Sequence, residues 1–301
     1  MSSLGLPFQN TVCYWQEASY GGGESGTTLP VSCKIIDARI GVGDKHKTLR
    51  GIDHAYVCSL LEQPEDLTFH IEYIPQIGDT LIDDSVDRNS GCTLTSQAFF
   101  IGVNRLLTPA SDTSYYYLTG CVPKTVNFSG SKGNEYVVSI DYSVKSVVTG
   151  TTKAHGGNLA GGDGLTGAYC AFNVGGSITK NGGAFAYVLN SVDITINHNV
   201  TDGWDHDSLT KQYAVPGAMD FEGSVDISLD EGGVADFGEV LSQTSWDLIV
   251  NMGAATAPKI TINNCQWKSM DIDLNLSGED IMSSIPFTGK PSSCSLIIST
   301  V

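Results

Sequence analysis

Apolar and polar residues alternate along many stretches of this sequence, and the clearest alternation lies on either side of residues 198–218. Apolar residues alternate with polar residues over 192–197, and again over 219–229 apart from a glycine at 223. The apolar positions are Val192, Ile194 and Ile196, then Phe221, Val225, Ile227 and Leu229. A period of two predicts strands that turn one face to a core and present the other, polar face. The polar residues between the two strands predict a loop.

The predicted loop contains a short sequence that recurs far upstream. Identical residues stand at one offset (203 − 51 = 152): Gly51, Asp53, His54, Pro64 and Phe69 match Gly203, Asp205, His206, Pro216 and Phe221. Further along, Cys121 and Lys124 match Cys265 and Lys268 at a smaller offset (265 − 121 = 144). Insertions in loops would change the offset between the two copies in this way. We therefore interpret the chain as a tandem duplication of one β-domain, with the first copy and an N-terminal arm in residues 1–150 and a Gly-rich linker and the second copy in 151–301.

The remaining segments complete an all-β prediction. Further strands are predicted over 31–43, 67–77, 93–107, 114–130, 134–148, 245–253, 258–264, 267–276, 280–289 and 294–300, with a hairpin over 168–183. Two short helices are allowed, over 55–62 and 231–243. Residues 78–91 hold four Asp without the spacing of a calcium loop, so we expect a solvated loop there. Residues 1–30 and 150–167 are Gly-rich and irregular, and we expect them to order against neighbouring subunits.

Charge and targeting signals narrow the function classes. The chain has 33 acidic and 16 basic residues, a formal net charge of −17 and a pI near 4.5. This balance disfavours binding to nucleic acid phosphates or anionic membranes, and its simplest role is solubility. No run of 18 apolar residues occurs, and the start lacks the basic flank and apolar block of a signal peptide. We expect folding in a cytoplasm and no membrane partner.

Motifs for catalysis and for metal binding are weak. The eight cysteines lie at least 20 residues apart, so they form no local zinc clamp, and we expect reduced, packed thiols. There is no GxSxG, HExxH or Walker sequence. The repeated GxDH pairs an acid with a histidine, which suits acid–base work or a metal, but neighbouring residues of a strand point to opposite faces. A turn or interface role for both copies is the simpler hypothesis, so we predict no catalytic residues, no metal and no cofactor.

Several patterns in the second copy together resemble a known family. They are ITINxN at 194–199, FxGSVxIxL at 221–229, IxINNC at 260–265 and SGEDIMSSIPFTG at 277–289. The order resembles the major tail tube proteins of long-tailed bacterial and archaeal viruses, in particular those with two tube domains in one chain. The resemblance covers most of residues 31–301.

The resemblance implies a fold and an assembly. Each domain is expected to be an antiparallel β-sandwich whose sheets join round a ring into an inner barrel, with a long hairpin or loop that reaches the next ring. Stacked rings form the hollow virion tail tube through which viral DNA passes without specific binding. Single-domain members form hexamers, whereas a tandem chain favours a trimer. Baseplate or tail-tip, tape-measure and tail terminator proteins are the implied partners.

Alternating polar residues supply candidates for the lining of such a lumen. They are Glu222, Ser224, Asp226 and Asp230 on one strand, Ser269, Asp271 and Asp273 on another, and Ser139 and Asp141 in the first copy. A lumen that carries carboxylates repels phosphates, so DNA slides without sticking.

Three alternatives stay open from the sequence. The first is the inner tube of a contractile injection system, which has the same fold. The second is a double β-sandwich module for carbohydrate binding or adhesion, for which Trp204, Trp246 and Trp267 are available. An enzyme is the third, and it requires a convergent acidic site that the sequence does not display.

Overall fold

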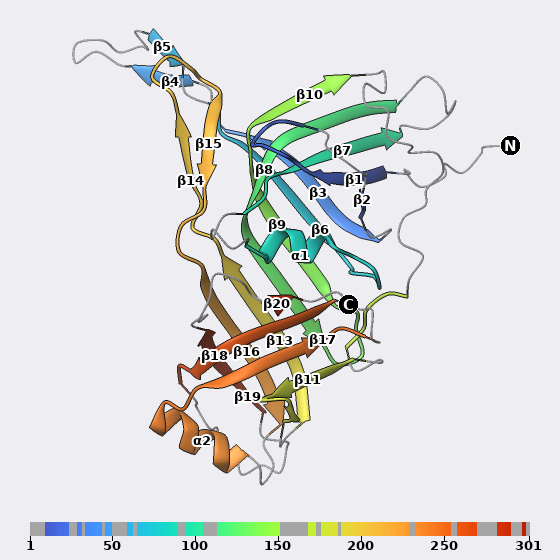
Figure 1. Cartoon of the computed structure of the whole chain (residues 1–301), viewed down its shortest axis with the longest axis vertical. Helices are drawn as coiled ribbons and strands as arrows, with labels where there is room; N and C mark the ends of the chain where they lie inside the picture. Colours follow the sequence, from blue (N-terminus) through green and yellow to red (C-terminus); the bar gives the residue numbers. More distant parts are fainter. Residues whose placement is uncertain are drawn as a thin grey trace, which may run out of the picture.

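The structure is a computed structural model, and the following residues are described. They are 10–23, 29–31, 34–43, 46–49, 59–62, 65–88, 94–104, 113–150, 168–172, 176–185, 188–228, 233–253, 258–269, 282–289 and 297–298. These residues form a curled, mainly antiparallel sheet with two short helices and two hairpin arms at one side (Figure 1).

Strands dominate both halves of the chain. The first half contains β1 (Asn10–Gln16), β2 (Leu29–Pro30), β3 (Ile35–Val42), β4 (His46–Leu49), β5 (Ser59–Glu62), β6 (Leu67–Tyr73), α1 (Leu81–Val86), β7 (Gln97–Asn104), β8 (Thr113–Ser131), β9 (Val137–Val144) and β10 (Ser146–Gly150). The second half contains β11 (Ser177–Lys180), β12 (Gly183–Ala184), β13 (Val188–Asn197), β14 (Thr201–Trp204), β15 (Lys211–Val215), β16 (Asp220–Ser228), α2 (Gly233–Ser242), β17 (Trp246–Asn251), β18 (Lys259–Trp267), β19 (Met282–Gly289) and β20 (Ile297–Ile298). The all-β prediction is confirmed.

The two halves use the same pairing order. In the first half, neighbouring strands pair in the order β2-β1-β7-β8-β9-β6-β3. In the second half the order is β12-β11-β17-β18-β19-β16-β13. In each half, a hairpin arm connects the last two strands of this order. The first arm, β4–β5, lies between β3 and β6, and the second arm, β14–β15, lies between β13 and β16.

The halves join through main-chain pairing. Strand β13 pairs with its own neighbour β16 on one side and with the last third of β8 on the other, from Asn197 opposite Thr125 to Ser191 opposite Ser131. Strand β8 is therefore shared by both halves. All 16 strands outside the arms belong to one sheet within the part of the chain that the structure describes.

A left-handed residue recurs in the corresponding long strands. Gly120 in β8 has φ 63° and Asn264 in β18 has φ 57°. Each precedes a buried cysteine, Cys121 or Cys265, and each lies where the register with the preceding strand shifts. Gly and Asn are the residues that adopt this conformation most readily, so the bulge is built in both halves by suitable residues.

The alternating apolar residues meet in a core that runs through both halves. In the first half, Phe69, Phe99 and Tyr142 stack within 5.0–5.8 Å between ring centroids. In the second half, the ring of Trp246 lies 4.4 Å from that of Trp267 and 5.6 Å from that of Phe287. The described cysteines Cys13, Cys121, Cys170 and Cys265 are buried thiols, as expected of packed side chains.

Several local predictions are wrong. Residues 10–16 form β1, which pairs with β7, so most of the predicted irregular N-terminal arm belongs to the sheet where it is described. Residues 59–62 are a strand and not part of a helix, and the polar loop after β13 is the second arm. The expected solvated loop over 78–91 includes α1, whose Leu81, Ile82 and Val86 are buried. The helix over 231–243 is confirmed by α2.

A buried histidine ties the end of α1 to the end of β13. His198 Nε2 lies 2.9 Å from the carbonyl of Ser85, and its Nδ1 lies 3.1 Å from a guanidinium nitrogen of Arg88. A carbonyl only accepts and a guanidinium only donates, so Nε2 carries the proton and Nδ1 is bare. Burial, with a contribution from the charge of Arg88, lowers the pKa of His198 to about 4.

Gly120→Ala is expected to destabilise the protein by about 1–3 kcal/mol, because an alanine there is left-handed and its Cβ meets that of Lys145. Built on the backbone, this Cβ lies 2.5 Å from the Cβ of Lys145. The matched control is Gly133→Ala, which has φ 84° but nothing within 4 Å of the added atom. Urea unfolding of both variants measures the difference. Equal losses would show that the close contact with Lys145 has no effect.

The stability supplied by His198 is expected to fall as the pH falls. The pKa of His198 in the folded protein lies below its value in the unfolded chain, so the unfolded chain takes up the proton first. The folded protein therefore loses stability relative to the unfolded chain as the pH falls from 6.5 to 4. The advantage of the wild type over His198→Gln should shrink by about 2 kcal/mol between pH 7 and pH 5. Burial raises the pKa of Asp79 to about 7, which acts in the opposite direction but cancels in this comparison. A difference that stays constant with pH would contradict the assignment.

Candidate functional site

A continuous polar face crosses seven strands of the sheet. The strands are β3, β6, β9, β8, β13, β16 and β19, in spatial order. Their apolar residues point to the core, so the alternate residues point to the other side. We call these alternate residues the polar face.

The register aligns the polar face into rows across the strands. One row consists of Asp37, Glu72, Ser139, Asn127, Thr195, Glu222 and Thr288, each opposite the next. The row starts in the first half of the chain and ends in the second half. Thr195 donates to the side chain of Asn127 at 3.0 Å, so the row is also bonded across the junction between the halves.

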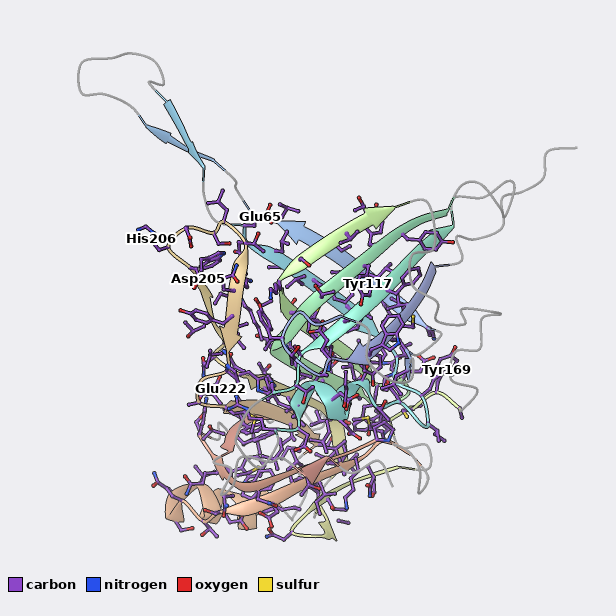
Figure 2. All side chains as sticks on the ribbon, turned by 45° about the horizontal axis from the view of Figure 1, so that its top comes forward. Glu65, Tyr117, Tyr169, Asp205, His206 and Glu222 are labelled. Carbon is purple, nitrogen blue, oxygen red and sulfur yellow. The ribbon has the colours of Figure 1, made fainter. Side chains whose placement is uncertain are left out.

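The structure brings most of the described candidate residues together on this face. Ser139 and Asp141 of β9 lie on it with Glu222, Ser224 and Asp226 of β16, although the two strands are far apart in sequence. Figure 2 shows Glu222 on the ribbon of this strand. Ser269 follows β18 and is exposed. Asp230, Asp271 and Asp273 lie outside the described residues.

Carboxylates outnumber cations on the polar face, and some of them interact. Asp193 lies near Asp226, and burial together with the charge of Asp226 raises the pKa of the Asp193 carboxyl. Glu222 pairs with Lys268 at 2.6 Å. The face is therefore acidic but carries isolated cations at its margins.

The second arm carries the described copy of the GxDH sequence. Gly203 lies in β14, where the ring of Tyr213 covers it so closely that an added Cβ would overlap the ring at 1.9 Å. Asp205 and His206 lie at the exposed turn of the arm (Figure 2). The first copy, Gly51, Asp53 and His54, lies outside the described residues.

A buried lysine anchors the second arm. Lys211 in β15 has no exposed surface, and its Nζ lies 3.1 Å from Asp202 in β14 and donates to Ser143 of β9. Lys124 of β8 also reaches Asp202, at 2.9 Å. These charges thus hold the second arm against β8 and β9 of the first half.

The charged groups of this network shift one another's pKa values. Burial alone would raise the pKa of the Asp202 carboxyl, but hydrogen bonds from Ser143 and Lys124 and the charge of Lys211 hold it below its usual value. Burial lowers the pKa of Lys211, and Asp202 opposes that shift. The network was not predicted, because a single lysine in a polar stretch carries no signal of burial.

The turn end of the second arm also contacts the base of the first arm. The main-chain N–H of Glu65, between β5 and β6, donates to the carbonyl of Leu209 at 2.8 Å. The indole of Trp204 donates to the carbonyl of Glu65 at 3.3 Å. Both arms therefore project from the same side of the sheet (Figure 1).

Comparison with protein families identifies the group to which this architecture belongs. The model of the phage tail tube protein family matches residues 24–289, which is most of the chain. The chain belongs to the phage tail tube protein family. No curated protein sequence matches it.

As a tail tube protein, the chain is a structural component of a viral tail. Its family assigns it to the virion tail and to self-assembly with other tail proteins. Neither of the two described helices has the length and hydropathy of a membrane-spanning segment.

Asp202→Asn is expected to cost this tail tube protein about 3–5 kcal/mol, because it removes the nearer carboxylate from the buried Lys211 and leaves only the exposed Asp66, at 3.8 Å. Urea unfolding measures the loss, and limited proteolysis should detect a loosened second arm. The control is Glu222→Gln, which breaks an exposed ion pair and should cost less than about 1 kcal/mol. Equal effects of the two variants would contradict the anchor.

Proposed function

We propose that this tail tube protein polymerises as stacked rings into the hollow tube through which viral DNA leaves the virion. The polar face across seven strands carries the proposal: it is a long, hydrated, acidic surface on the side of the sheet away from the core. Such a surface lines a conduit for DNA, because carboxylates repel phosphates and leave no site where the duplex would be held.

The junction between the halves supports a specific mode of ring closure. Strand β3 holds the same place in the first half as β13 in the second, but among the described strands it pairs only with β6. Strand β3 exposes Ile36 at a bulge and Val42 at its end, which are 51% and 57% exposed, whereas Val192 of β13, beside β8, is fully buried. An unpaired edge with apolar residues needs a partner strand.

We assign that partner to a second copy of the chain. The β8·β13 junction within one chain would recur between chains, with β3 of one copy against the end of β18 of the next, after its Asn264 bulge. Two tube domains in each chain would then give a trimeric ring in which junctions within chains alternate with junctions between chains.

The arms support the stacking of rings. The outer surface of the second arm carries Leu209, Tyr213 and Val215, each between 44% and 53% exposed. Because Lys211 and Asp202 anchor the arm against the first half, the arm would present these residues in a fixed direction toward an adjacent ring. Baseplate or tail-tip, tape-measure and terminator proteins would begin, measure and end the tube.

Electron microscopy of the purified protein at high concentration, with light scattering of a dilute sample, tests the proposal. Hollow tubes with a regular axial repeat are expected. A wild-type protein that forms no tubes under any concentration tested would contradict self-assembly. Tubes whose reconstruction places Glu222 and Asp141 on the outer surface would contradict the lumen assignment.

The double variant Ile36→Lys/Val42→Lys is expected to fold and yet to form no tubes, since lysines on an edge strand prevent strand addition. The matched control is Leu241→Lys on α2, where the side chain is 73% exposed and lies away from β3. Circular dichroism checks folding and electron microscopy counts tubes. Normal tubes from the double variant would exclude β3 as the contact between chains.

A further inference from the structure

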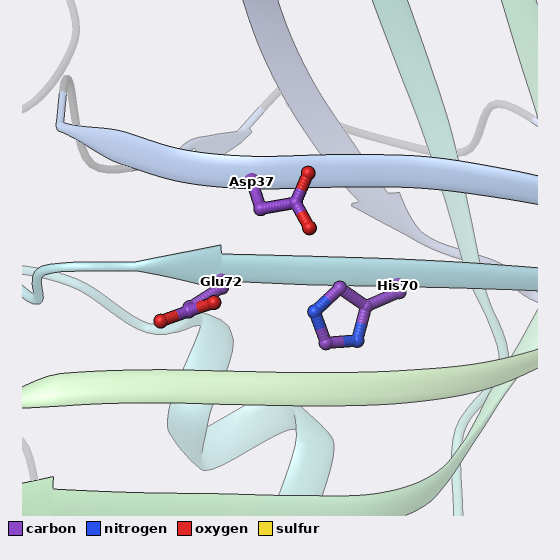
Figure 3. A group of neighbouring side chains, drawn as sticks. All are labelled: Asp37, His70 and Glu72. Atoms are coloured by element: carbon purple, nitrogen blue, oxygen red, sulfur yellow. The ribbon is translucent and has the colours of Figure 1, made fainter.

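One cluster on the polar face has the composition of a metal site. Asp37 of β3 and His70 and Glu72 of β6 each place a potential ligand atom within 4.8 Å of the other two. His70 and Glu72 are two positions apart, so they share a face, and Asp37 is directly opposite Glu72. Figure 3 shows the His70 ring beside the two carboxylates.

The orientation of the histidine favours a ligand. Its Nδ1 lies 2.7 Å from Asp141 Oδ1 on β9. When the imidazole is neutral, the carboxylate can only accept, so Nδ1 carries the proton and Nε2 has a free lone pair. Nε2 is the ring nitrogen on the side of Glu72 (Figure 3). A carboxylate behind a histidine is the usual support of a metal-binding imidazole.

We propose that Asp37, His70 and Glu72 bind one divalent transition cation of the zinc type, with Asp141 as a positioning residue. One imidazole and two carboxylates are a ligand set that such cations accept, and water completes the coordination at this half-exposed place. The competing cation is Arg39, whose guanidinium lies 2.6 Å from Asp37. Its side chain is 77% exposed, so it can turn away into solvent when a metal ion binds.

The second half of the chain provides an internal comparison. In the equivalent pairing of β13 with β16, Asp193 stands opposite Ser224, and Glu222 takes the place of His70. The second half therefore has a carboxylate where the first half has the imidazole of His70, and a serine where the first half has Glu72. The proposal is therefore one site in each chain, and the ion would link the edge strand β3 to β6.

Zinc titration by calorimetry of the dilute protein tests the site without any need for tube assembly. The wild type should bind one more zinc ion per chain than either His70→Asn or Glu72→Gln, and zinc should raise the melting temperature of the wild type but not of these two variants. The control Glu222→Gln changes the equivalent position of the second half and should match the wild type. Zinc binding that is the same in the wild type and in both ligand variants would overturn the proposal, as would no binding by the wild type.

Asp141→Asn separates a positioning role from a purely structural one. The variant should keep the stoichiometry of the wild type while its affinity for zinc falls by about 10–100-fold. In the wild type, zinc should shift the NMR resonance of His70 Nε2 more than that of Nδ1. A larger shift at Nδ1, or unchanged affinity in Asp141→Asn, would show that Asp141 does not orient the histidine.

Discussion

Main-chain pairing at the edges of strands is the constraint on which this structure depends. A strand with free N–H and C=O groups recruits another strand. Within the chain, the long strand β8 pairs with four other strands. β7 and β10 pair with its first part, and β9 and β13 pair with its last part. The left-handed Gly120 lies between these parts, where the register with β7 shifts. Gly120 therefore marks the point along β8 near which pairing with β7 ends, before the part that pairs with β13 of the second half.

Continuity of the backbone carries both faces of the sheet across the junction. On the core side, Ile194 lies opposite Phe128, and both are buried. On the other side, Thr195 lies opposite Asn127 and bonds to it. Since side chains alternate strictly along paired strands, an apolar core and an acidic surface are propagated together by the same register. Under the proposed function, ring closure through β3 would extend both faces to the next chain in the same way.

The sequence predicted the fold best where one period described one environment. The strands around Val192, Phe221 and Ile140 each have a core on one side and water on the other, and alternation revealed them. Helix α1 was missed because its Asp83 and Asp84 suggest a solvated loop, while the burial of Leu81 depends on contacts distant in sequence. The Asp79 carboxyl, which is fully buried, and the pair of Arg88 with His198 are likewise products of tertiary packing.

The candidate residues were predictable as polar alternation, but their assembly into one face was not. That assembly depends on β8 meeting β13, and no local pattern encodes which strand edges meet. The cluster of Asp37, His70 and Glu72 was not predictable either, because Asp37 is 33 positions from His70 in the sequence (70 − 37 = 33). The two residues come together only when β3 pairs with β6.

The second arm shows the limit of pattern analysis most clearly. Along β15, Lys211 is buried whereas Tyr213 and Val215 are about half exposed, so the alternation is the reverse of that in a core strand. The assumption that apolar positions face the core of the same chain fails here. Burial of the lysine is stabilised by Asp202 and Ser143, and this network holds the apolar side chains outward in a fixed direction. The buried ion pair holds an arm that presents tyrosine and valine to solvent, so the arm has a surface suited to another molecule. Under the proposed stacking of rings, that molecule would be a neighbouring ring.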